Sequence, residues 1–173
     1  RISGGTPGAS STTRPRIAAG GGMVYVVYED VRDGTISSMY LNRSLDDGVN
    51  WQASDTLLSS GTAHAFDAQM ALAPDGRLHI VFQDYAEGLP LIRCLSSSDS
   101  GASFSSAIVD ARRGFSSTPQ IILSQAGNPI VAYLDDRDGY RDVYLNFSMD
   151  RGLSFHAFDL RMNLGVPAGT ADA

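Results

Sequence analysis

The stretch S-L-D-D-G-V-N-W at residues 44–51 recurs as S-S-D-S-G-A-S-F at 97–104 and as S-M-D-R-G-L-S-F at 148–155. The copies share the pattern S-x-D-x-G-x-x-[W/F] and begin 53 and 51 residues apart. Ser and Asp side chains bond to nearby backbone N–H groups, and Gly accepts a positive φ at no steric cost. Each copy therefore predicts a tight turn between two strands, after which the aromatic residue returns the chain to apolar packing.

The spacing of the copies indicates a repeat protein. Periods of roughly 40–50 residues fit the blades of a β-propeller. Because the same residue types recur in every copy, we expect them to have a structural role in the turns. These residues are Ser44, Asp46, Gly48, Trp51, Ser97, Asp99, Gly101, Phe104, Ser148, Asp150, Gly152 and Phe155.

The repeated stretch resembles the Asp box, or bacterial neuraminidase (BNR) repeat, of the sialidase-like β-propeller superfamily. The flanks repeat as well, because a Gly, a β-rich run, an aromatic residue and an Asp precede each copy, at 22–30, 76–84 and 127–135. The resemblance implies an all-β fold made of β-propeller blades. It further implies three four-stranded antiparallel sheets, each with its Asp-box turn between strands 3 and 4.

The repeats predict one domain, a partial sialidase-like propeller over residues 1–173, with blades at about 14–60, 67–110 and 118–162. Within these blades the fourth strands are expected at 51–57, 104–109 and 155–160.

Propellers commonly have 4–8 blades, so three repeats predict a fragment or a half-ring, about half of a six-bladed propeller. A second copy or a missing segment is expected to complete the ring, since bare apolar faces mark interfaces. The uncovered end faces are expected to carry Val24, Val26, Tyr144 and Phe147.

Composition excludes several classes of function. The net charge of −6 disfavours nucleic acid and anionic membranes as partners, and no apolar run is long enough to predict membrane insertion. Cys94 stands alone and is expected to be buried as a small hydrophobe. The three His residues have no metal-ligand spacing, so no cofactor is expected. Calcium stays open as an alternative, because the loop 134–142 is rich in Asp.

A four-stranded blade places its 2–3 loops and its links to the next blade on one face, and its other turns on the opposite face. Ligand-binding groups are expected on the first of these faces, because loops carry function. The candidates are Arg14, Arg16, Arg32, Asp84, Arg137 and Tyr140. The alternative is that the repeated Asp-x-Arg-Asp-Gly loops only hold turns through Arg–Asp pairs. An aromatic patch from Tyr85, Phe115 and Tyr140 would favour sugar binding.

The sialidase resemblance implies an Arg triad, an Asp acid/base and a Tyr nucleophile assisted by Glu. Asp33 is the nearest match to the acid/base, and Arg14-Pro15-Arg16-Ile17 stands where an R-I-P phrase is usual without reproducing it. The other catalytic residues have no counterpart, so enzymatic activity stays open. The sequence favours a non-catalytic module that binds glycans or proteins on its loop face. The resemblance implies an extracellular or periplasmic location in a bacterium. The alternative is part of a sialidase-type exo-glycosidase whose remaining catalytic residues lie outside this chain.

Overall fold

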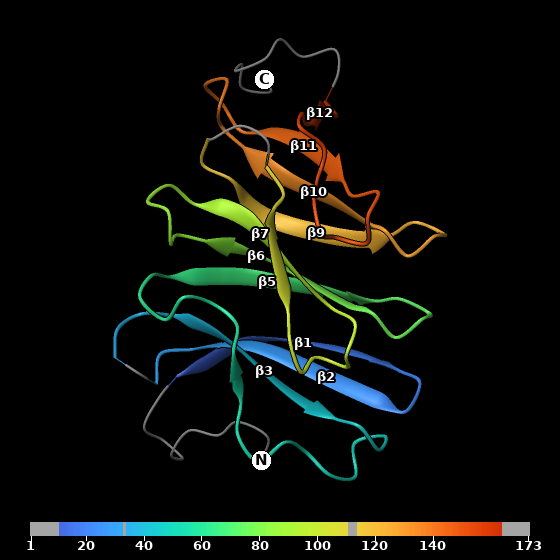
Figure 1. The fold of residues 1–173 in the computed structure, drawn as a ribbon. Helices are drawn as coiled ribbons and strands as arrows, with labels where there is room; N and C mark the ends of the chain where they lie inside the picture. The colour runs from blue at the N-terminus through green and yellow to red at the C-terminus, as the bar shows by residue number, and fades with distance from the viewer. Residues whose placement is uncertain (1–10, 33, 111–113, 164–173) are drawn as a thin grey trace.

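The computed structural model describes residues 11–32, 34–110 and 114–163. Over these residues the chain forms twelve strands and no helix, so the all-β prediction is confirmed. The strands make three antiparallel sheets of four, which are stacked as propeller blades (Figure 1). The first blade contains β1 (Thr12–Gly20), β2 (Met23–Asp30), β3 (Ser38–Ser44) and β4 (Thr56–Leu57); the second contains β5 (Ala65–Leu72), β6 (Leu78–Asp84), β7 (Leu91–Ser97) and β8 (Ser105–Ile108); the third contains β9 (Ser117–Leu123), β10 (Pro129–Asp135), β11 (Asp142–Phe147) and β12 (Leu160–Arg161).

Each blade is a meander in which consecutive strands pair. The first strands of the blades are neighbours in space, since β1 contacts β5 and β5 contacts β9. The three first strands thus lie in the order β1, β5, β9, as the innermost strands of a propeller are placed.

The blades are held together by two interfaces, which we call the first seam and the second seam. Side chains alternate along each strand, so each sheet sends one set toward each neighbouring blade. The first seam buries Tyr25, Val27, Met39 and Leu41 of the first blade against Ala65, Ala68, Leu78, Ile80, Phe82 and Leu95 of the second. The second seam buries Val81, Ile92, Cys94 and Val109 of the second blade against Val131, Tyr133 and Tyr144 of the third.

The lone cysteine lies in this second cluster. Cys94 is fully buried, as the sequence suggested, and burial raises the pKa of its thiol to about 12. A thiol of this kind stays protonated at neutral pH and packs as an apolar group.

The fourth strands are shorter than predicted in the first and third blades. Strand β4 covers only Thr56–Leu57, and β12 only Leu160–Arg161. The cause is a side-chain amide on the third strand, because Asn42 donates to the carbonyl of Gln52 and to the carboxylate of Asp55. These bonds take the place of a ladder over the residues before β4, and Asn146 does the same before β12.

The prediction for the end faces is wrong for Tyr144, which packs inside the second seam. Val26 lies on the face of the first blade that points away from the second blade, but it is buried there in a cluster with Tyr28 and Tyr40, against which Trp51 packs. Val24 and Phe147 are half-buried. Phe147 shares its face of the third blade with Ile122, which is 65% exposed.

Candidate functional site

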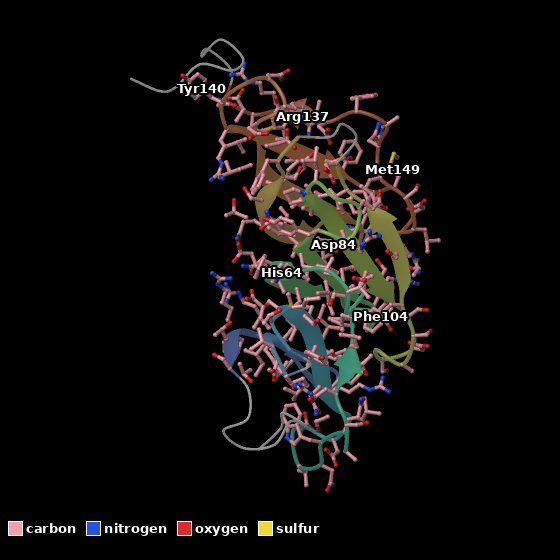
Figure 2. All side chains as sticks on the ribbon, turned by 90° about the vertical axis from the view of Figure 1, so that its left-hand side faces the viewer. His64, Asp84, Phe104, Arg137, Tyr140 and Met149 are labelled. Atoms are coloured by element: carbon pink, nitrogen blue, oxygen red, sulfur yellow. The ribbon has the colours of Figure 1, made fainter. Side chains whose placement is uncertain are left out.

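The loops of the three blades form two opposite rims. Tyr140 and His64 lie along one side of the molecule, and Phe104 and Met149 lie along the other (Figure 2). We call the first rim the mouth. It is formed by the loops after β2, β6 and β10 and by the links that lead into β5 and β9.

Each innermost strand carries an irregularity near the mouth. The pairing register shifts in β1, in β5 and in β9. One residue at each shift has a left-handed backbone, namely Arg14 with φ 49°, Asp67 with φ 55° and Thr118 with φ 48°. Such a conformation costs a non-glycine residue on the order of 1–2 kcal/mol, and bulges re-aim side chains next to functional sites. The same distortion therefore presents three chemically different side chains in a row.

An ionic cluster joins the first two members of that row. Arg14 Nη1 lies 3.1 Å from Glu29 Oε2, and Arg14 Nε lies 3.6 Å from Asp67 Oδ1. The backbone N–H of Asp67 also donates to Glu29 Oε1 over 2.9 Å. The charge of Glu29 is the main cause that raises the pKa of Arg14, followed by its hydrogen bond and the charge of Asp67. Glu29 is buried while the Arg14 side chain is 51% exposed, so the cluster opens onto the mouth.

Aromatic rings continue from this cluster toward the third blade. His64 stacks on Phe66 with 5.3 Å between ring centroids. Tyr85 meets Phe66 edge to face at 5.8 Å and meets Phe115 in the same way at 6.3 Å. The guanidinium of Arg141 lies 5.6 Å from the Phe115 ring centre. We call the four rings of His64, Phe66, Tyr85 and Phe115 the aromatic ridge.

The expected aromatic patch is therefore present only in part, and His64 and Phe66 extend it. Tyr85 and Phe115 are neighbours, whereas Tyr140 is 56% exposed and has no ring contact with them among the described residues. Binding pockets for small molecules combine aromatic walls with a few placed polar groups. The ridge beside the Arg14 cluster has that composition.

Two predicted ligand-binding arginines have their charge balanced inside their own blades. Arg32 lies 2.9 Å from Asp30 and 2.6 Å from Asp55, with its guanidinium 3.9 Å from the ring centre of Tyr40. Burial opposes the charge of Arg32, yet hydrogen bonds to Asp55, Tyr28 and Asp30 raise its pKa.

The third blade repeats the arrangement around Arg137. Arg137 pairs with Asp135 and with Asp159, and its guanidinium lies 4.3 Å from the ring centre of Tyr144. Its side chain is nearly buried, so the structure does not bring Arg32 and Arg137 together at one ligand site.

The remaining predicted residues are scattered. Asp84 is buried and pairs with Arg93. Arg16 donates to the carbonyl of Pro15 over 3.1 Å. Asp33, the weak candidate for an acid/base, lies outside the described residues.

Sequence reasoning missed Glu29 and Asp67, which engage Arg14, and Thr118 at the third bulge. It also missed His64 and Phe66 of the ridge. One signal exists in retrospect, because Arg14, Asp67 and Thr118 stand eight or nine residues before the glycines of the following turns, Gly22, Gly76 and Gly127.

The repeated S-x-D-x-G stretches form turns on the rim opposite the mouth, at Phe104 and Met149 in Figure 2. In each turn the Ser hydroxyl donates to the Asp carboxylate over 2.7 Å and accepts the N–H of the Gly. The Asp carboxylate also accepts the backbone N–H four residues later. Hydrogen bonds lower the pKa of the three Asp carboxyls. The largest cause is the backbone N–H of Asn50 for Asp46, and the side-chain hydroxyls of Ser103 and Ser154 for Asp99 and Asp150.

The described residues contain no group of three or more His, Cys, Asp or Glu side chains arranged to hold a metal ion. Within the same part of the chain, no helix is long and apolar enough to span a bilayer.

No protein-family model matches the chain, and no curated protein matches its sequence. Solved structures match its fold. A protein of unknown function from Dyadobacter fermentans superimposes with a TM-score of 0.65 at 15% identity, over 88% of this chain and 51% of that one. A glycosyl hydrolase from Bacteroides ovatus has a TM-score of 0.58 at 14% identity, over 88% of this chain and 49% of its own.

Another solved structure comes from work on the GH130 family of mannoside phosphorylases, which contains glycoside hydrolases that target β-1,2 mannosidic linkages in Candida mannan. It has a TM-score of 0.59 at 12% identity. It matches over 93% of this chain and 55% of its own. The chain thus spans about half the length of these structures. At such identities the likeness establishes the fold alone. The chain has the β-propeller fold found in glycoside hydrolases.

Proposed function

We propose that the mouth of this chain binds neutral glycans, as a non-catalytic module of a β-propeller. The aromatic ridge is the observation that carries the proposal. Sugar rings have apolar faces that pack on aromatic side chains, and their hydroxyl groups need polar partners close by. Arg14, Asp67 and Thr118 supply such partners at the inner end of the ridge.

The charge balance of the mouth favours neutral over acidic sugars. Recognition of a ligand carboxylate requires an Arg fork that is free to bind it in two places. Arg14 is engaged by Glu29 and Asp67, and Arg137 by Asp135 and Asp159. A sialic acid carboxylate would compete with carboxylates that the fold already provides, which weighs against the sialidase version of the function.

A further segment belongs to the proposal. Three blades leave the apolar side of the third blade, with Ile122 and Phe147, open to another sheet. Either a second copy or a missing segment would complete the ring. We propose extracellular or periplasmic glycans of a bacterium as the setting, in line with the resemblance of the repeats to secreted propellers.

A second candidate function is part of a glycoside hydrolase. It is favoured by the hydrolase names of the solved structures and by two carboxyl groups at the mouth, those of Glu29 and Asp67. Glycosidases use such pairs as acid and base or nucleophile. In this version the remaining catalytic residues lie in the half of the ring outside this chain.

Affinity electrophoresis through neutral polysaccharides (mannan, xylan and glucan), together with calorimetry using sialyllactose, tests the proposal. We expect retardation by a neutral polymer and no heat with sialyllactose. Phe66→Ala should weaken binding about tenfold, the effect of losing about 1.4 kcal/mol. Phe158→Ala is the matched control, since Phe158 is 56% exposed and does not belong to the ridge.

The two candidates give different results with Glu29→Gln. A binding module releases no reducing sugar with or without the substitution. A hydrolase fragment, once its ring is complete, releases sugar only with Glu29 intact. Absence of retardation by every neutral polymer, or binding of sialyllactose alone, would overturn the proposal.

A further inference from the structure

A buried hydroxyl stands between two buried carboxyl groups at the entry to the third blade. Ser116 Oγ lies 3.0 Å from Asp110 Oδ2 and 2.5 Å from Asp135 Oδ2. All three residues are buried. Asp110 ends the second blade, Ser116 lies in the link before β9, and Asp135 ends β10, so the contact chain crosses the second seam.

The number of protons available decides which groups donate in the contacts of Asp110, Ser116 and Asp135. A Ser hydroxyl has one proton and can donate to one carboxylate only. Asp135 is the better acceptor, since Arg137 Nε lies 2.7 Å from its Oδ1 and its pKa is lowered in spite of burial. The contact with Asp110 is then a hydrogen bond only if Asp110 is protonated and donates to Ser116. Burial raises the pKa of Asp110 to about 6, which agrees with that assignment.

Residues 114–116 pack closely against the Asp135 carboxyl group. A Cβ atom on Gly114 would lie 2.2 Å from Asp135 Oδ1 and 2.7 Å from the backbone nitrogen of Arg137. Phe115 follows at once, and its N–H donates to Asp136 Oδ1 over 2.8 Å. The position of the Phe115 ring, the outer member of the ridge, therefore depends on the same short link.

We propose that Asp110, Ser116 and Asp135 form a proton-dependent latch that positions Phe115, so that the mouth binds its ligand more tightly in mildly acidic than in alkaline solution. The inference rests on the proposed function of the mouth. Below the titration of Asp110 the chain of donors runs from Asp110 through Ser116 to Asp135. Above it, two carboxylates face one hydroxyl proton, and the link loosens.

Other charged groups near the latch do not replace this proton. Arg137 is already engaged by Asp135 and Asp159. Asp136 accepts the N–H of Phe115. His156 follows the S-x-D-x-G turn of the third blade. Together with Asp110 it lines a cavity of about 470 Å³ at the second seam.

Asp110→Asn is the decisive variant. Its amide can donate to Ser116 at every pH while its oxygen still accepts the N–H of Ile92, which now donates to Asp110 over 3.0 Å. Asp75→Asn is the control, an exposed carboxyl on the opposite rim. Amide hydrogen exchange of residues 114–116 and carboxyl carbon NMR are measured without ligand, from pH 5 to pH 8.

In the parent protein and in the control we expect one carboxyl signal to titrate near pH 6. Protection of the link should fall about tenfold or more across that range, after correction for intrinsic exchange. Asp110→Asn should lose the signal and keep the protection at both ends of the range. An Asp110 that titrates near pH 4, or equal exchange in parent and variant at pH 8, would overturn the latch. The affinity for the polysaccharide that retards the protein, measured over the same pH range, tests separately whether the latch affects binding.

Discussion

The side chains that cluster in the first seam are apolar. In the second seam the apolar cluster shares the interface with buried polar side chains, among them His79 and Ser96. The two seams differ at equivalent places in the repeat. Tyr25 pairs across strands with Arg43 in the first blade, and His79 pairs with Ser96 in the second. Each pair meets the turn of the following blade, so the same repeat docks its neighbour with different chemistry.

The difference is largest around the turn glycines. At the first seam, Arg43 donates to the carbonyl of Ser100, and the nearest atoms to a Cβ on Gly101 would lie at 3.4 Å or beyond. At the second seam, Ser96 Oγ contacts His79 Nδ1 at 2.8 Å, and a Cβ on Gly152 would approach Ser96 Oγ to 2.2 Å. The turn glycine is therefore packed more closely at the second seam than at the first, and the contact there includes the titratable side chain of His79.

The largest expected effect is loss of an aromatic residue from the first seam. Phe82 is fully buried there. Phe82→Ala should lower the free energy of unfolding by about 3–5 kcal/mol, because a large cavity replaces the ring. Urea unfolding at pH 5 and pH 7.5 measures the loss. Equal losses at both values are expected from an apolar site, and a loss confined to one pH would contradict this account of the first seam.

Substitution of the turn glycines compares the two seams directly. Gly152 and Gly101 both have positive φ, 83° and 78°, so Ala costs each of them on the order of 1–2 kcal/mol. At Gly152 the clash with Ser96 adds an overpacking cost of about 1–3 kcal/mol. Gly152→Ala should thus be the more damaging by chemical denaturation. Equal losses in the two variants would mean that the second seam can open without cost.

His79 gives the second seam a lower pH limit. The imidazole is fully buried, and burial first, then the charge of Arg77, lowers its pKa to about 4. A folded-state pKa below the unfolded value of about 6.5 means stability that is present above pH 6.5 and lost as the pH falls toward 4. The loss should approach about 3 kcal/mol. His79→Gln should flatten this acid limb in thermal unfolding scans, and an unchanged limb would place its cause elsewhere.

The fold was predictable because the repeat carries it. Three turns with the same Ser, Asp and Gly chemistry predicted three blades of four strands. The lengths of β4 and β12 were not predictable, since they depend on the amides of Asn42 and Asn146 reaching carboxylates 13 residues away. In the second blade Leu95 stands at that place, and β8 runs from Ser105 to Ile108.

The site was predictable only in part, for a similar reason. The Asp-x-Arg-Asp-Gly loops look alike whether their Arg is free or bound. The partners that engage Arg32 and Arg137, namely Asp55 and Asp159, lie 23 and 22 residues further along the chain. The left-handed positions at Asp67 and Thr118 arise from cross-strand register, which a single sequence does not display.

The smallest expected effect concerns a charge pair on the surface of the second seam. Arg151 Nη1 lies 3.5 Å from Asp75 Oδ2, with the two side chains 56% and 49% exposed. Exposed pairs contribute little, so Asp75→Asn should change the free energy of unfolding by less than about 0.5 kcal/mol. Even this change should shrink in 0.5 M salt, where screening is strong. A loss above about 1 kcal/mol in urea unfolding would contradict the contrast drawn between the seams, because it would assign their difference to surface charge rather than to the buried contacts of His79 and Gly152.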